Sequence, residues 1–188
     1  MKAREIFEES REVLENFLNN EAQINSIEEA AKLMSSCLDS GGKIISCGNG
    51  GSMSDAMHFA EELSGRFRND RKGLAAVSIS DPSHITCVAN DYGFEKVFSR
   101  YVESLGKQND ILLAISTSGN SKNVLEAAKA AAKMNMKIVA LTGKGGGQLK
   151  DFSDIEIRAP HSDYSDRAQE IHIKVIHCLI QLIEQSIR

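Results

Sequence analysis

Short apolar segments alternate with longer amphipathic segments along most of the chain. The helical patterns lie at about 53–67, 93–106 and 121–135, between segments that predict strands. The predicted strands are nearly continuous in apolar residues, as expected when helices cover both faces of a sheet. This alternation predicts an α/β fold with a doubly wound, parallel sheet. Five strands are predicted, at 43–47, 74–79, 110–115, 137–142 and, shorter, at 154–159.

Extra helices are predicted at both ends of the chain. Residues 1–40 predict two amphipathic helices separated by residues 19–25, and the second ends at Gly41 and Gly42. The last helix, at about 163–187, is apolar on nearly all sides and is expected to be buried. The N-terminal pair exceeds what the sheet needs, so we expect it to form an oligomeric interface. The two apolar stripes of this pair consist of Ile6, Val13, Leu14, Phe17 and Leu18, and of Ile27, Ala30, Ala31, Met34 and Leu38.

Length and composition restrict the class of protein. The 188 residues predict a single domain spanning 1–188, and both prolines are expected in loops. A net charge of −4 with scattered basic residues argues against a nucleic-acid or membrane-surface partner. The four cysteines are far apart, which favours free thiols in a reducing cytoplasm over disulfides or a zinc finger. Since no signal peptide or membrane span is visible, we expect a cytoplasmic protein.

Two glycine- and serine-rich turns follow predicted strands. "SCGNGGS" occupies 46–52 and "STSGNS" occupies 116–121, each before a predicted helix; "TGKGGG" at 142–147 is a third. Ligands of open α/β sheets bind at such strand ends, where helix N-termini favour anions. No dinucleotide or P-loop fingerprint fits, so we expect a phosphate monoester and no nucleotide cofactor. The alternative is that they are ordinary turns whose hydroxyl groups only cap helices.

Titratable residues that could perform chemistry lie on two predicted helices. His58 and Glu62 are four residues apart on one helical face, although such pairs are usually solvated surface contacts. Gln169 and His177 lie eight apart on the last helix, where a histidine in an apolar run is often a core residue bonded to a carbonyl. His172 and Glu170 compete with this pair, and periodicity does not choose among them. Asp166 and Arg66 flank these motifs and are interpreted first as surface ion pairs.

Several motifs together resemble the sugar isomerase (SIS) domain and, within it, the phosphoheptose isomerases. The resemblance covers nearly the whole chain and implies a flavodoxin-like sheet. It also implies an aldose–ketose isomerase that converts D-sedoheptulose 7-phosphate to D-glycero-D-manno-heptose 7-phosphate through an enediol, the entry to ADP-heptose synthesis for lipopolysaccharide core. The motifs that carry it are "SCGNGGS", "SISDPSHITCVANDYGFEKVFSRYV", "ISTSGNSKNV", "AMHFAEELSGRF", "LTGKGGG" and "DRAQEIHIKVIH".

The same resemblance implies the roles of individual residues. Glu62 would be the catalytic base and His177 the acid, and His58, Glu62, Gln169 and His177 would hold one Zn²⁺ per subunit. It also implies a homotetramer with active sites between subunits. The substrate contacts that it implies are Asn49, Gly50, Gly51, Ser52, Glu62, Asn90, Asp91, Ser116, Thr117, Ser118, Ser121 and Gln169.

Two other functions have to be weighed against the enzyme. A non-catalytic SIS adaptor that binds a replication-initiation protein would share the glycine and serine loops but lack the Glu62 and His177 pair, which is present here. A phosphosugar-sensing regulator would usually carry a DNA-binding segment, for which the chain has neither spare length nor a basic face. Both comparisons favour the enzyme.

Overall fold

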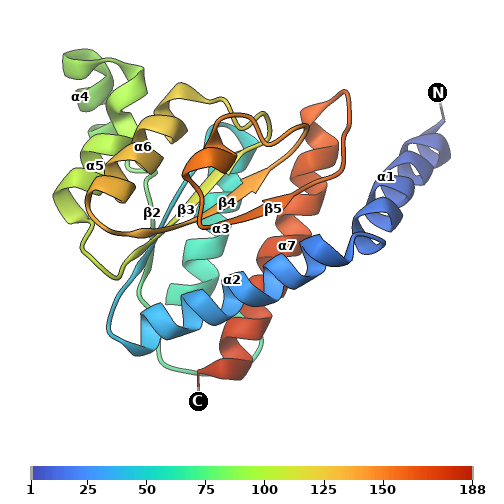
Figure 1. The fold of residues 1–188 in the computed structure, drawn as a ribbon, viewed down its shortest axis with the longest axis horizontal. Coiled ribbons are helices and arrows are strands. Elements are labelled where there is room, and N and C mark those ends of the chain that lie inside the picture. The colour runs from blue at the N-terminus through green and yellow to red at the C-terminus, as the bar shows by residue number, and fades with distance from the viewer. Residues whose placement is uncertain (1, 188) are drawn as a thin grey trace.

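Five parallel strands form one sheet in the computed structural model, which describes residues 2–187. Their spatial order is β2-β1-β3-β4-β5, and every neighbouring pair is parallel (Figure 1). This is the doubly wound, flavodoxin-like order, so the predicted fold class is confirmed. The strands are β1 (Ile44–Cys47), β2 (Ala76–Ser78), β3 (Ile111–Ser116), β4 (Lys137–Thr142) and β5 (Ile155–Arg158).

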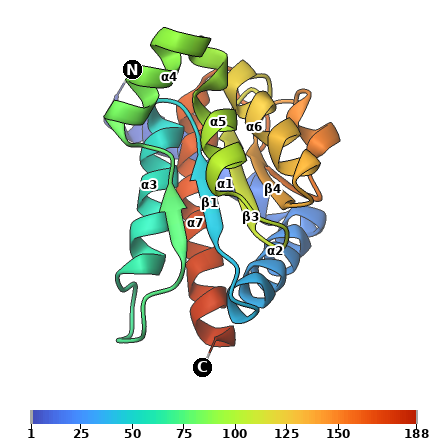
Figure 2. The same ribbon diagram turned by 90° about the vertical axis from the view of Figure 1, so that its left-hand side faces the viewer.

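Helices cover the sheet on both faces. One layer contains α2, α3 and α7, and the other contains α5 and α6 with α4 beyond them (Figures 1 and 2). Two 3₁₀ turns, η1 (Phe94–Lys96) and η2 (Leu149–Phe152), complete the second layer. The helices are α1 (Ala3–Leu18), α2 (Glu21–Asp39), α3 (Gly51–Ser64), α4 (Pro82–Tyr92), α5 (Val97–Leu105), α6 (Lys122–Lys133) and α7 (Ser165–Ser186).

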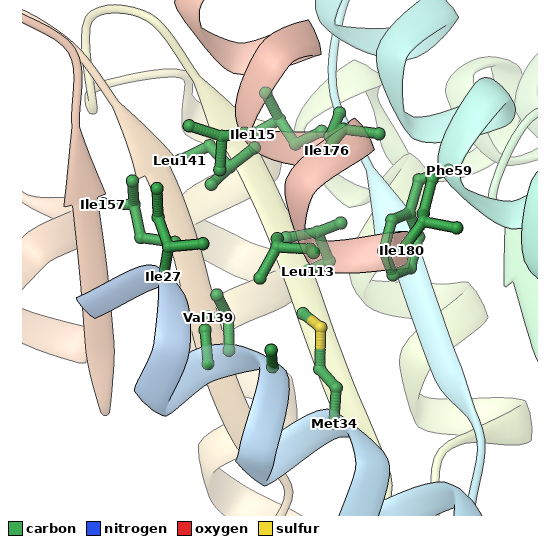
Figure 3. Packing of buried hydrophobic residues seen from close by; sticks show 14 of the residues in the cluster. Ile27, Met34, Phe59, Leu113, Ile115, Val139, Leu141, Ile157, Ile176 and Ile180 are labelled. Carbon is green, nitrogen blue, oxygen red and sulfur yellow. The ribbon is translucent and has the colours of Figure 1, made fainter. Parts of the chain in front are cut away.

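The apolar strands pack against two separate cores because successive side chains of a strand point to opposite faces. Leu113 enters the core shared with α2, α3 and α7, whereas its neighbour Leu112 enters the core shared with α5 and α6. All six residues of β3 are buried. Figure 3 shows the first core, where Met34 from α2 and Ile180 from α7 approach Leu113. Double coverage therefore explains why these segments show almost no polar alternation.

Two boundaries differ from the prediction. A helix at Pro82–Tyr92 was not predicted, and one of the two prolines is therefore in a helix rather than a loop. Asp81 caps this helix by accepting the His84 N–H at 2.8 Å, and Pro82 at the first helical position has no N–H to satisfy. The helix α2 begins at Glu21, capped by Asn20, so most of the predicted 19–25 spacer is helical. In both cases the helix begins directly after a capping residue, Asn20 or Asp81, although the apolar pattern near that residue is weak.

The helix α1 projects from the body of the molecule (Figure 1). Of its predicted stripe only Phe17 is buried, while Ile6 and Leu18 are exposed together with Phe7. Within residues 2–187, no helix combines the length and the apolar character that crossing a membrane requires.

Candidate active site

The first two glycine-rich turns lie side by side at the switch point of the sheet. The strands β1 and β3 are paired, and the chain leaves β1 toward β2 on one side and β3 toward β4 on the other. Residues 48–50 and 117–120 therefore follow neighbouring strands at the switch point, the usual ligand position in this fold. In the described chain, no side chain caps the N-terminus of α3 or of α6, the helices that follow these turns. The N–H groups of Ser52 and Met53 already donate to the backbone carbonyls of residues 49 and 50, and the Val124 N–H donates to a side chain of its own turn. The first N–H group of α3 and the first two of α6 have no acceptor among the described residues, and helix ends of this kind favour an anion.

The second and third glycine turns contact each other through the backbone. Gly119 has a φ of 64°, and a Cβ on it would lie 1.9 Å from the carbonyl oxygen of Gly146. Both the left-handed conformation and this approach require glycine. The backbone of the "TGKGGG" turn therefore packs directly against the "STSGNS" loop.

Hydroxyl groups are concentrated in these turns. Ser116 is buried and donates from Oγ to Ser121 Oγ at 3.0 Å, and Ser118 Oγ accepts the Asn120 N–H at 3.1 Å. Ser52 is buried in the first turn of α3, and Thr117 is half-buried beside Ser118. The hydroxyl groups of Ser116, Thr117, Ser118 and Ser121 thus lie in one loop at the carboxyl end of β3, and Ser52 lies in the turn that follows the neighbouring β1.

Asn123 is a residue of this region that the sequence did not single out. Its Nδ2 donates to Asn49 Oδ1 at 2.8 Å, and Asn49 Nδ2 donates to Asn123 Oδ1 at 2.8 Å. Asn123 is buried and also accepts the Val124 N–H at 3.0 Å. These bonds join the first loop to the start of α6 and occupy the side-chain amide of Asn49. An amide two residues after a serine-rich turn carries no distinctive pattern, so only the fold reveals this pair.

A second group of polar side chains lies farther along α3 and α7. His58 Nε2 is 2.9 Å from His177 Nε2 and 3.7 Å from Glu62 Oε1. His58 and Glu62 are half-buried, with 32% and 19% of their side chains exposed. Two imidazoles and a carboxylate from two distant parts of the sequence therefore meet at one point.

Glu61 and Phe67 frame this cluster. Glu61 Oε1 lies 3.0 Å from His58 Nδ1, so it accepts that N–H and leaves Nε2 to face His177 and Glu62. The ring of Phe67 stacks on His177 with centroids 5.7 Å apart. Partial burial lowers the pKa of His177 below its usual value, the charge of His58 adds to this, and Glu62 opposes it.

The donor set of the cluster is suitable for a metal ion. His58, Glu61 and Glu62 each offer one ligand atom within 4.8 Å of the others. Because Glu61 lies on the Nδ1 side of His58, it would support the histidine rather than share an ion bound at Nε2. The nitrogen atoms of His58 and His177 with the oxygen of Glu62 form a group that suits Zn²⁺ or a similar cation.

Other predicted site residues lie away from the imidazoles. The side-chain amide of Gln169 packs against Gly51, where a Cβ would lie 2.7 Å from Gln169 Oε1. Gln169 therefore lies beside the glycine-rich turn at residues 46–52. Asn90 and Asp91 are exposed at the end of α4, where the Asn90 Nδ2 donates to Asp91 Oδ1 at 2.8 Å. Among the residues described, no hydrogen bond or ion pair joins these three side chains to His58 or His177.

The competing residues have other partners. His172 is fully buried, and its Nε2 donates to the carbonyl of Thr142 at 2.8 Å. Burial lowers its pKa to about 4. The interpretation as a core histidine, considered for His177, therefore applies to His172. Glu170 binds Arg167 and Ser10. Asp166 and Arg66 are exposed, and neither has an ion-pair partner within residues 2–187.

Comparisons with known proteins identify the family of the chain. The family model described as the SIS domain matches residues 5–143. The chain is 62% identical over 180 residues to a phosphoheptose isomerase of Cytophaga hutchinsonii, covering 96% of this chain and 94% of the relative. It is 58% identical over 183 residues to that of Pectobacterium atrosepticum, covering 97% and 95%.

Solved structures show the same relationship. A phosphoheptose isomerase structure from Francisella tularensis superposes with a TM-score of 0.92 at 42% identity, covering 97% of this chain and 96% of that one. One from Neisseria gonorrhoeae gives 0.90 at 41% identity with the same coverage. With identity at these levels over nearly its full length, the chain belongs to the phosphoheptose isomerase family of SIS-domain proteins.

Proposed function

We propose that the protein isomerises D-sedoheptulose 7-phosphate to D-glycero-D-manno-heptose 7-phosphate in the cytoplasm, as the entry to ADP-heptose synthesis. One observation carries the proposal: Glu62 and His177, from separate helices, meet around His58. The relatives named phosphoheptose isomerase supply the substrate class. The chemistry that such a conversion needs is a base at carbon and an acid at oxygen, and the cluster offers both.

The spacing between the two polar groups suits a long phosphosugar. Gly51 and His58 lie seven residues apart on α3, a rise of about 10 Å at roughly 1.5 Å per residue. Gln169 and His177, eight apart on α7, are separated by about 12 Å in the same way. A phosphate held by Ser116, Thr117, Ser118 and Ser121 would place the far end of an extended seven-carbon chain toward the imidazoles. Gln169, beside Gly51, would contact the sugar between them.

The proposed reaction moves one proton between carbons and one between oxygens. Glu62 removes a proton from C1, and the electron pair of that C–H bond forms the C1=C2 bond of an enediol. His177 delivers a proton to the C2 oxygen, which becomes a hydroxyl group. The proton then returns at C2 while the C1 hydroxyl loses its own, which generates the aldehyde. General acid–base catalysis of this type contributes about 10²- to 10⁴-fold to a rate.

We infer that His58, Glu62 and His177 hold one Zn²⁺, with Gln169 as a fourth ligand only if its side chain leaves Gly51. A bound Zn²⁺ would polarise the substrate oxygens or order the site. Glu62 then has two candidate roles, ligand and base, that draw on the same carboxylate. Metal analysis of protein purified without added metal, with a His58→Ala variant as comparison, tests this assignment: full zinc occupancy in that variant removes His58 from the ligand set.

We also propose a homotetramer whose active sites include a neighbouring subunit. The exposed apolar residues Ile6, Phe7 and Leu18 on the projecting α1 support an interface there. Light scattering at micromolar concentration tests the assembly, and a monomer contradicts it.

The test of the proposed reaction is exchange of the C1 proton. Wild-type protein is mixed with sedoheptulose 7-phosphate in D₂O, and loss of the C1 proton signal is followed by NMR. We expect exchange by the wild type and a loss of about 10³-fold in the Glu62→Gln variant. Equal rates for the two proteins would remove Glu62 as the base.

A further inference from the structure

The segment that joins α3 to β2 is fixed by one arginine. Arg71 has only 14% of its side chain exposed, and its Nε–H donates to Glu184 Oε1 at 2.7 Å. Its Nη2 donates to the carbonyl of Glu62 at 2.7 Å and its Nη1 to that of Leu63 at 2.8 Å. Weaker bonds from Nη1 reach the Lys72 and Gly65 carbonyls. One guanidinium thus binds the end of α3 and the segment that follows it.

These bonds reach two carbonyls of the last turn of α3, where a helix leaves its carbonyls without intrahelical partners. The Leu63 carbonyl also accepts the Leu74 N–H at 2.9 Å, so the carbonyl of Glu62 is the one that depends on Arg71. The last turn of α3 contains no basic residue, so its negative dipole end has no charge partner on the helix itself. Arg71 supplies that charge from the following segment. Because it binds the backbone of Glu62, it acts on the turn that carries the proposed base.

Glu184 connects Arg71 to α7, the other helix of the site. Its side chain is 8% exposed, and it follows His177 by seven residues on α7, two helical turns along the same face. Glu184 Oε2 also accepts the Arg68 N–H at 3.5 Å. Figure 2 shows the connection from α3 to β2 at the end of the molecule where α7 finishes. The ion pair therefore ties the C-terminal turn of α3 to α7.

The same segment places an aromatic ring on the proposed acid. Phe67 stacks on His177 with an angle of 29° between the rings, and the guanidinium of Arg68 lies 5.4 Å from the centre of the Phe67 ring. Arg71 holds the segment that carries Phe67, and Glu184 lies on the helix that carries His177. Their ion pair therefore restrains both rings of the stacked pair. The segment 65–72 therefore contacts His177 through the Phe67 ring and the backbone of Glu62 through Arg71.

We propose that Arg71, paired with Glu184, is a positioning residue that sets the approach of Glu62 on α3 to His177 on α7. This inference deepens the proposed isomerase and rests on it. Arg71 acts through the backbone and through Phe67, and it does not touch the substrate. Partners that orient metal ligands typically change metal affinity or activity by about 10- to 100-fold when replaced.

Conservative substitutions separate positioning from folding. Arg71→Lys keeps a positive charge for Glu184 but cannot reach the carbonyls of Glu62 and Leu63 with a planar group. Glu184→Gln keeps an oxygen that accepts the Arg71 Nε–H. Lys43→Gln is the matched control, because Lys43 and Asp110 form a comparable partly buried ion pair at the same, amino-terminal edge of the sheet. Within residues 2–187 neither side chain bonds to the 65–72 segment or to α7.

Two readouts are measured on each purified full-length variant after its melting curve is recorded. The first is Zn²⁺ affinity, by competition with a chromophoric chelator. The second is kcat and KM for C1-proton exchange of sedoheptulose 7-phosphate. For Arg71→Lys we expect about 10-fold weaker Zn²⁺ binding and about 10-fold lower kcat, with KM changed by less than about twofold. Glu184→Gln should stay within about threefold of wild type in both.

The outcomes distinguish the inference from the function on which it rests. Wild-type values for Arg71→Lys in both readouts overturn the positioning role while the isomerase proposal stands. Equal losses in Lys43→Gln also overturn it, because they reveal a general effect of stability. A wild-type protein that neither binds Zn²⁺ nor exchanges the C1 proton overturns the proposed function, and this inference with it.

Discussion

The two ends of the candidate site are built in different ways. At the anion end, backbone N–H groups, glycine contacts and a closed amide pair form the surface, and Asn49 and Asn123 satisfy each other. At the imidazole end, His58, Glu62 and His177 meet as side chains, with no such closed pairing. In the proposed function the first would hold the phosphate with a fixed backbone, and the second would move protons through its ionisable side chains. The contrast predicts that binding and turnover can be impaired separately.

The largest difference between the effect on turnover and the effect on binding is expected for His177→Gln. The variant loses the acid, so exchange of the C1 proton should fall by roughly 10³-fold, about 4 kcal/mol in the barrier. The affinity for inorganic phosphate, measured by calorimetry, should not change, because the anion loops are distant. Cys178→Ala, an exposed neighbour on α7, is the control and should behave as wild type. A parallel fall in phosphate affinity would show that the two ends are one unit.

Gly119→Ala tests the fixed backbone by sterics. The new Cβ would meet the Gly146 carbonyl oxygen at 1.9 Å, in a left-handed backbone conformation, so we expect a loss of about 3 kcal/mol in unfolding free energy. Gly145→Ala is the matched control, since a Cβ there meets no atom within 4 Å. Urea denaturation of both variants measures the difference, and similar stabilities would mean that the turns do not pack as described.

The buried His172 allows a pH test of the contact between α7 and Thr142, which precedes the third glycine-rich turn. Its folded-state pKa of about 4 lies below the ordinary value of 6.5, so the unfolded chain binds a proton more readily. The stability it supports is therefore complete above the unfolded pKa and is lost as the pH falls below it, toward the folded pKa. Between about pH 7.5 and about pH 5 the expected loss is about 2 kcal/mol.

Urea titrations at these two pH values, on wild type and His172→Gln, isolate this contribution. The variant should lose less stability on acidification than the wild type does, by about that 2 kcal/mol. Equal acid sensitivity of the two proteins would mean that His172 is not held neutral against Thr142.

Asn123→Ala should have the smallest effect and the opposite character to His177→Gln. It leaves the amide of Asn49 without a partner and loosens the link between the two loops, so we expect about 1.5 kcal/mol less binding energy, roughly a 10-fold higher KM. The kcat for exchange should stay near wild type. Steady-state kinetics checks this, and an effect on kcat alone would count against a role in holding the anion.

The sequence was informative where the chemistry is local. Gly48, Gly119 and the serines around it form a pattern that is visible without the fold, since a glycine-rich turn before a helix has a direct physical reading. The parallel, doubly wound sheet was predicted from apolar segments such as β3, which are buried on both faces, whereas the flavodoxin-like order was implied by the family resemblance. Both results depend on neighbours in the chain.

The rest depends on contacts between distant segments. Periodicity does not choose between His172 and His177, and only the contacts of α7 with β4 and α3 show that His172 is a core residue and that His177 joins the polar cluster. The resemblance, not the spacing, chose between them. Asn123 and Arg71 were missed because an isolated asparagine or arginine has no pattern, and their partners lie far away in the sequence or in backbone carbonyls.

A crystal structure of the Glu62→Gln variant with sedoheptulose 7-phosphate tests the two-ended site most directly. The account predicts that the phosphate lies against Ser116–Ser121 and the first turn of α3, with C1 and C2 between residue 62 and His177. A sugar bound in the reverse direction, or with its C1–C2 bond remote from His177, would contradict it.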